Sequence, residues 1–194
     1  MAKKYHHGDL RAALIQATID TVAEHGIHAV KVSALARALG VSSAAPFRHF
    51  SSRLDLLVAA AEHASVEWMR AVEDATSNAQ SPLHAQRLIG VTYVRFATTN
   101  PGHFRLLTNA EIIAASPALT ALNAADMKEM DLVLGEHRNE PAARRTAGTL
   151  AAEAITLGLS QMIVGGLLGE VSPEQAELLA DQVLGVLGRG LGGE

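Results

Sequence analysis

The chain of 194 residues contains no cysteine, so it has no disulfide framework and no thiolate chemistry. This composition fits a reducing compartment, and we expect a cytoplasmic protein. Two lysines stand near the N-terminus, but no apolar run follows them, so we expect no signal peptide.

Sequence motifs of common enzyme sites are also missing. We find no glycine-rich phosphate loop, no Cys/His metal spacing and no nucleophile elbow. Two adjacent histidines, His6 and His7, rarely bind a metal without further ligands. Nine histidines and scattered carboxylates could still assemble a site in space, although nothing in the sequence requires it. We therefore expect no enzyme, no cofactor and no metal, and keep a helical enzyme or a helical interaction module without DNA binding as alternatives.

No segment alternates apolar and polar residues as a half-buried strand does, whereas apolar residues recur at helical spacing. The sequence predicts an all-α protein. The expected helices span about 9–25, 33–39, 43–50, 53–76, 82–99, 103–109, 117–133, 141–169 and 173–189.

The segment 141–169 has hardly a polar face, so we expect it to be buried on more than one side. A membrane span is the rival interpretation. Thr156, Ser160, Gln161 and several glycines make the clean run too short and too polar for the ~20 apolar residues that a span needs. We expect no membrane partner.

The stretch from Val32 to Phe50 predicts two short helices joined by a tight turn. Gly40 ends the first, because glycine adopts a left-handed conformation at little cost. Ser42 or Ser43 can cap the second, and with Ser43 as the cap Pro46 is its third residue. Phe47 and Phe50 are expected to face inward. A helix, a glycine turn and a second helix is the arrangement that places its second helix in the DNA major groove.

Charge is divided unevenly along the chain. Residues 1–53 hold seven lysines and arginines against three acidic residues, whereas the remainder holds nine against 17. A basic N-terminal part on an acidic body suggests a polyanionic partner at one end only.

The stretch ends in Phe47-Arg48-His49-Phe50, and here it resembles the DNA-binding motif of TetR/AcrR-family transcriptional regulators. These commonly read V-S-x-x-x-x-Y-R-H-F, so Phe47 replaces the usual tyrosine. The segments 5–11 and 44–46 resemble one subgroup, whose C-terminal half carries a Trp-His-Gly motif. The chain departs from that motif: if Gly158 is its glycine, Leu157 and Glu153 stand where histidine and tryptophan are expected.

The resemblance implies a three-helix DNA-binding domain at 1–52 and a helical ligand-binding and dimerisation domain at 53–194. It also implies a ligand-responsive regulator, usually a repressor, that binds a near-palindromic double-stranded DNA operator as a homodimer. The predicted DNA-binding residues are Lys3, Lys4, Ser33, Ser42, Ser43, Ala44, Ala45, Phe47, Arg48, His49 and Arg53. Without a hydroxyl group Phe47 can only pack, and Arg53 stands where the family often has a phosphate-binding lysine.

Two further sets of residues are predicted on the helical body. Cavities between helices are natural sites for a small, largely apolar effector. Its pocket residues are predicted to be Trp68, Tyr93, Phe96, His103, Phe104 and Met162. The homodimer is expected to form through the helices 142–169 and 173–189, with Gly158, Met162, Gly165, Leu179, Val183 and Val186 at the interface.

Overall fold

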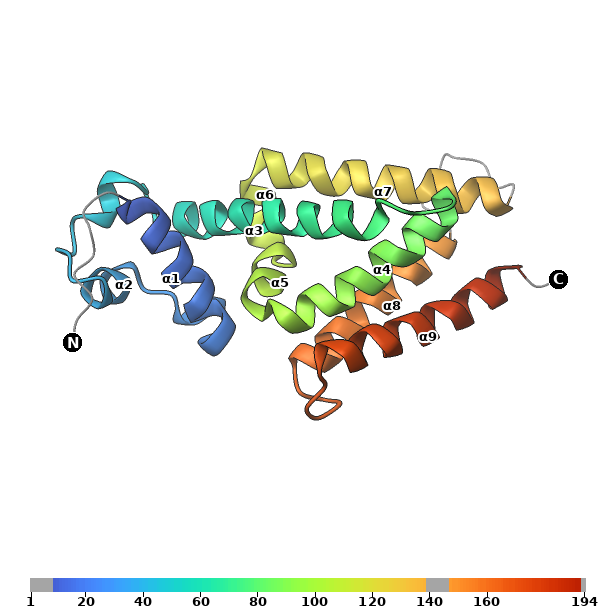
Figure 1. Cartoon of the computed structure of the whole chain (residues 1–194). Coiled ribbons are helices and arrows are strands. Elements are labelled where there is room, and N and C mark those ends of the chain that lie inside the picture. Colours follow the sequence, from blue (N-terminus) through green and yellow to red (C-terminus); the bar gives the residue numbers. More distant parts are fainter. Residues whose placement is uncertain (1–8, 139–146, 193–194) are drawn as a thin grey trace. The chain divides into compact units, whose positions relative to one another are not determined.

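The computed structural model describes residues 9–138 and 147–192, and over these residues the chain is helical without any strand, which confirms the all-α prediction (Figure 1). The elements are α1 (Leu10–His25), η1 (Ile27–Ala29), α2 (Val32–Ala38), η2 (Pro46–Arg48), α3 (Arg53–Thr76), α4 (Pro82–Thr99), α5 (Pro101–Leu107), α6 (Ala110–Ala115), α7 (Pro117–Arg138), α8 (Ala147–Val164) and α9 (Pro173–Gly192).

The chain divides into two compact units. The N-terminal unit runs up to Glu67 and adds Pro101–Thr120, and the C-terminal unit holds Trp68–Asn100 and the chain from Ala121 onward. Helix α3 therefore contributes residues to both units. This division by packing differs from the expected division by function at residue 52, which stays a prediction.

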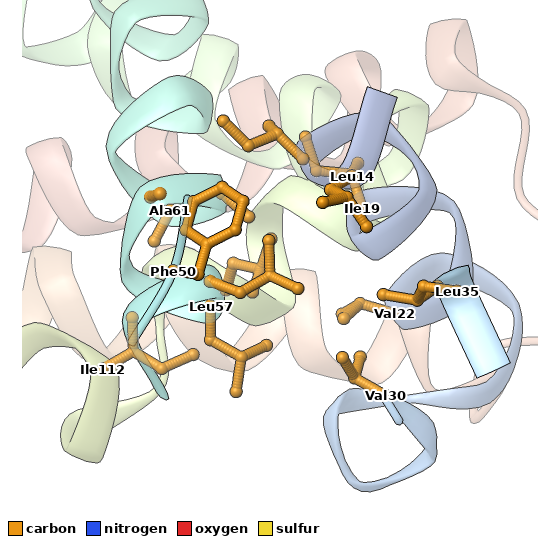
Figure 2. Packing of buried hydrophobic residues seen from close by; sticks show 14 of the residues in the cluster. Leu14, Ile19, Val22, Val30, Leu35, Phe50, Leu57, Ala61 and Ile112 are labelled. Atoms are coloured by element: carbon orange, nitrogen blue, oxygen red, sulfur yellow. The ribbon is translucent and has the colours of Figure 1, made fainter. Parts of the chain in front are cut away.

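The core of the N-terminal unit is built from large aliphatic side chains. Asp9 caps α1 by accepting a hydrogen bond from the Ala12 N–H at 2.9 Å, and α1 then buries Leu14 and Val22 completely. Figure 2 shows these side chains with Phe50 and Leu57 in one packed interior. This core holds together the helices that carry the helix-turn-helix stretch.

Helix α5 packs closely on α1 within the same unit. A Cβ atom on Gly102 would lie 2.5 Å from the backbone oxygen of Ile19, so only glycine fits at this crossing. Arg105 then donates hydrogen bonds from Nη1 to the carbonyl oxygens of Val22 (2.9 Å) and Ala23 (2.6 Å). These carbonyls lie in the last turn of α1, where a cation is favoured by the helix dipole.

The C-terminal unit packs α4 against α8 and α9 around Val94, Ile163, Ala176 and Ala180. A capping box starts α9. Ser172 accepts from the Gln175 N–H at 3.3 Å, and the Gln175 side chain accepts from the Ser172 N–H at 2.9 Å.

Two expected helices have other bounds. The helix expected to end at Gly169 ends at Val164, because Gly166 takes φ 75° and the Leu167 N–H turns back to the Met162 carbonyl. Its expected start at Pro141 lies outside the described residues. The single helix expected at 103–109 is instead α5 followed by α6, since Asn109 caps a new helix by accepting from the Ile112 N–H at 3.1 Å.

Helix α8 is long and apolar enough to cross a membrane by length and composition. A single helix of this kind is weak evidence for a membrane protein, because the core helix of a soluble protein can be equally long and apolar. Only 22% of this helix is buried within the chain, so the burial on more than one side that we expected is not reached in a single copy.

Candidate DNA-binding site

The turn of the helix-turn-helix stretch is set by Gly40, as predicted. This glycine has φ 71°, its N–H donates to the Arg37 carbonyl, and the Val41 N–H donates to the Ala36 carbonyl at 2.9 Å. Together these bonds form the closing motif that ends helices at a left-handed residue. Helix α2 therefore stops abruptly, and the chain turns into the segment that follows.

The second helix of the motif differs from the prediction. Ser43 and Ala44 form a turn, Ala45 a bend, and η2 follows as a short 3-10 helix. Its cap position is held by Ala45, and neither Ser42 nor Ser43 caps it. Pro46 is the first residue of η2, a position where its missing N–H would have no partner within the helix. The segment is held instead by the His49 and Phe50 N–H groups, which both donate to the Pro46 carbonyl.

Phe47 does not face inward as expected. Its side chain is 56% exposed, whereas Pro46 and Phe50 are buried. The inward positions of this segment are thus four residues apart instead of three. Phe50 packs in the core (Figure 2), and the Arg11 guanidinium lies 5.6 Å from the centre of its ring.

Most of the other predicted DNA-binding residues are exposed on the same unit: Ser33, Ser42, Ser43, Ala44, Arg48 and His49, with Ala45 half-buried. Ser33 is the second residue of α2, and Lys31 stands at the cap position of this helix. Lys3 and Lys4 lie outside the described residues. Arg11, Lys31 and Arg37 are exposed as well. These three basic residues are not among the predicted DNA-binding residues, although they contribute to the excess of positive charge in residues 1–53.

Arg53 has partners inside the protein. Its Nε donates to the Val30 carbonyl at 2.9 Å, and its Nη2 donates to the Ile27 carbonyl. Ser52, next to it, caps α3 by accepting from the Asp55 N–H at 3.0 Å, and Asp55 accepts in turn from the Ser51 N–H at 2.7 Å. The cap of α3 and the two hydrogen bonds from the Arg53 guanidinium thus both stabilise the start of α3.

The predicted pocket residues fall into two groups. Trp68, Tyr93 and Phe96 form an aromatic cluster in the C-terminal unit. The centre of the Trp68 ring lies 5.4 Å from that of Tyr93 and 5.5 Å from that of Phe96, and both pairs are edge-to-face. Burial foremost, and the charge of Glu153, raise the pKa of Tyr93 to about 12, so its hydroxyl is neutral at pH 7. Met162 belongs to the same unit, on α8, and is 40% exposed.

His103 and Phe104 instead belong to the N-terminal unit, buried on α5. His103 Nε2 lies 3.0 Å from a carboxylate oxygen of Glu67. Burial lowers the pKa of His103, and nearby His63 lowers it too, although Glu67 and Asp20 act in the opposite direction. Burial has the larger effect on the pKa of His103, because its side chain is only 11% exposed.

The predicted interface residues lie on α8 and α9 or just after α8. A Cβ atom on Gly158 would meet nothing within 4 Å, so this glycine borders open space in a single copy of the chain. Val186 is 62% exposed, and Leu179 and Val183 are half-buried. Gly165 follows the last residue of α8, where a Cβ atom would lie 2.8 Å from the Gln161 oxygen. Within the described part of the chain, no three His, Asp or Glu residues lie close enough to hold a metal ion.

The N-terminal part of the chain matches a known protein family. Residues 14–60, which span α1, the turn at Gly40, η2 and the start of α3, match the family described as bacterial regulatory proteins, tetR family. The match is confined to these residues, so it identifies a TetR-family DNA-binding domain in the N-terminal part of the chain. No curated protein matches it in sequence.

Solved structures extend the TetR-family likeness to the whole fold. A protein of unknown function from Rhodococcus sp. RHA1 is 27% identical, with a TM-score of 0.66, over 99% of this chain and 100% of that one. The ketosteroid transcriptional regulator KstR2 of Mycobacterium tuberculosis is 15% identical, with a TM-score of 0.70, over 95% and 96%. The TetR-family regulator PfmR of Thermus thermophilus is 23% identical, with a TM-score of 0.65, over 90% and 92%. The helical C-terminal part therefore also has the fold of TetR-family regulators.

Proposed function

We propose that this chain is a transcriptional repressor that binds a near-palindromic operator as a homodimer and releases it when a small, largely apolar molecule binds. One observation carries the DNA-binding part. The segment 42–49 stays exposed after the Gly40 turn, inside the domain that matches the TetR family. An exposed segment that a rigid core supports is suited to reading base edges.

The DNA contacts divide by chemistry. Ser33, Ser42 and Ser43 offer hydroxyl groups to phosphates, while Arg48 offers a cation to phosphate or base. Ala44, Ala45 and the exposed ring of Phe47 offer apolar surface to thymine methyl groups. Lys3 and Lys4 add basic charge ahead of α1.

A mobility-shift assay on the DNA upstream of the chain's own gene tests this proposal. We expect Arg48→Ala to weaken binding and, if Arg48 contacts phosphate, to lower the salt slope by about 1. The matched control is Arg70→Ala, which removes the same charge from an exposed position on α3 in the other unit. A chain that shifts no upstream fragment at low salt would contradict the proposal.

The dimer is proposed to form through α8 and α9. These helices leave Leu150, Met162, Leu178 and Val186 exposed in one copy, and burying them against a second copy would remove apolar surface from water. Two-fold symmetry then requires half-sites about 34 Å apart, or a multiple of that distance.

Sedimentation of Val183→Asp tests the interface. We expect monomers that bind DNA weakly, because one DNA-binding domain contacts only a half-site. Leu83→Asp, which introduces the same charge at an exposed apolar residue of α4, is the control and should remain dimeric. A wild-type chain that sediments as a monomer at micromolar concentration would contradict the dimer.

The effector is proposed to bind near the aromatic cluster of Trp68, Tyr93 and Phe96, because helices with aromatic side chains commonly line apolar ligand sites. Two neighbours in fold are named for related chemistry: KstR2, a ketosteroid regulator, and FadR of Bacillus halodurans, a fatty acid degradation regulator. A ligand can shift the dimer away from DNA only by its difference in affinity for the two states.

Thermal-shift screening with steroids and fatty acyl compounds identifies a ligand, whose affinity is then measured with and without operator DNA. Linkage requires operator to weaken ligand binding by the factor by which the ligand weakens operator binding. Equal affinities in the two conditions would leave a DNA-binding protein without an inducer.

A further inference from the structure

Arg53 occupies an unusual position for a cation. It is the first residue of α3, where the helix dipole disfavours positive charge. The chain compensates with two hydrogen bonds from the guanidinium, one from Nε to the Val30 carbonyl and one from Nη2 to the Ile27 carbonyl. The guanidinium therefore binds backbone oxygens that lie more than twenty residues earlier in the chain.

Those two oxygens belong to the connection that leads into α2. Ile27 opens η1, and Val30 closes it as a buried residue. The next residue, Lys31, stands at the cap position of α2 and forms no side-chain cap there. Because α2 has only seven residues, its own hydrogen bonds stabilise it weakly, and its placement depends on what holds its ends.

We propose that Arg53 is a positioning residue for DNA recognition: its fork joins the start of α3 to the start of α2 and so sets where the Gly40 turn and the segment 42–49 stand. This inference rests on the proposed DNA-binding function. It replaces the phosphate contact predicted for Arg53, because a guanidinium turned toward DNA would leave the two carbonyls without their charged donor.

Lysine and arginine separate the two roles. Lysine keeps the positive charge, so it can still contact a phosphate, but its single ammonium group lacks the planar fork that reaches two fixed acceptors. A phosphate role therefore predicts that Arg53→Lys is tolerated. A positioning role predicts that Arg53→Lys weakens operator binding nearly as much as Arg53→Ala does.

The experiment measures operator affinity against salt concentration for wild type, Arg53→Ala and Arg53→Lys, at a temperature where circular dichroism shows all three folded. We expect both variants to lose about tenfold in affinity, the loss that corresponds to one charged hydrogen bond, and to keep the wild-type salt slope. Arg48→Ala serves as the comparison for a contact made directly to DNA. A merely structural role would lower the unfolding temperature and leave the affinity of the folded protein unchanged.

Three results would overturn the inference: Arg53→Lys binding as wild type does, a slope lowered by about 1 in Arg53→Ala alone, or full affinity in both folded variants. Amide hydrogen exchange of residues 27–35 without DNA tests the clamp separately. We expect faster exchange there in both variants, and unchanged exchange would refute the clamp. If the wild type binds no DNA at all, the proposed function fails while this exchange result still stands.

Discussion

The two units of the chain bury different kinds of side chains. In the N-terminal unit, Leu14, Val22, Leu56, Leu57, Leu106 and Ile112 are almost completely buried. Over the described residues of the C-terminal unit, the side chains buried to the same degree are mostly small, such as Ala97, Ala176 and Ala180, whereas Leu150, Leu167, Leu178 and Val186 are exposed. The first unit completes its own core, whereas the second leaves large apolar side chains exposed in a single copy of the chain.

Removing a large core side chain from the N-terminal unit should have the largest effect. Leu57→Ala deletes buried methyl groups and leaves a cavity, so we expect the unfolding free energy to fall by about 2–5 kcal/mol. Leu83→Ala is the matched control, since Leu83 is an exposed apolar residue of α4 outside the proposed dimer interface, and it should change the stability little. Chemical denaturation followed by circular dichroism measures both, and equal losses would contradict the difference between the units.

Gly102 in the N-terminal unit and Gly90 in the C-terminal unit both lie in close contacts, and these contacts differ in rigidity. A Cβ at Gly102 would press on the Ile19 backbone oxygen, whereas a Cβ at Gly90 would meet the Leu184 side-chain end at 2.7 Å. We expect Gly102→Ala to cost about 1–3 kcal/mol, because backbone cannot yield cheaply. Gly90→Ala should be close to neutral, since alanine favours the helix by about 0.5–1 kcal/mol and Leu184 can change rotamer. Melting temperatures decide, and a larger loss for Gly90→Ala would contradict this contrast.

His103 gives the N-terminal unit a dependence on pH. Because burial lowers the folded pKa of His103 below its usual 6.5, the unfolded chain binds this proton more readily. The contribution of neutral His103 to the stability of the folded state is therefore complete above about pH 6.5, and it is lost as the pH falls toward the folded pKa. We expect His103→Gln to flatten the stability profile between pH 7.5 and 5. An unchanged slope in that variant would assign the pH dependence to other groups.

The smallest effect is expected at the surface of the C-terminal unit. Arg87 pairs with Asp181 at 2.8 Å and so joins α4 to α9, but both side chains are about half exposed. Such a pair contributes about 0.2–1 kcal/mol and weakens in salt. Arg87→Ala should therefore lower the melting temperature slightly at low salt and not at 1 M salt. A large loss that persists in salt would show a packing role for the arginine.

Local rules predicted much of the framework. Helix α3 spans Arg53–Thr76 as expected, because its apolar spacing is long and Ser52 caps its start. Gly40 ends α2, since no other residue takes its conformation as cheaply. The reading segment was harder to predict. A spacing of three suggested that Phe47 and Phe50 share a face, but the segment forms a short 3-10 helix in which Pro46 is buried and Phe47 is exposed.

The sequence by itself determined most of the long helices, the glycine turn and the basic N-terminal part, because capping, periodicity and charge act over a few residues. Only the tertiary structure decided what Arg53 and Gly102 contact. Their partners, the carbonyls of Ile27 and Val30 and the backbone of Ile19, lie tens of residues away in the chain. Every residue has a backbone oxygen, so the sequence does not indicate which of them a distant side chain will bind. Only the folded structure shows that the guanidinium of Arg53 binds those of Ile27 and Val30.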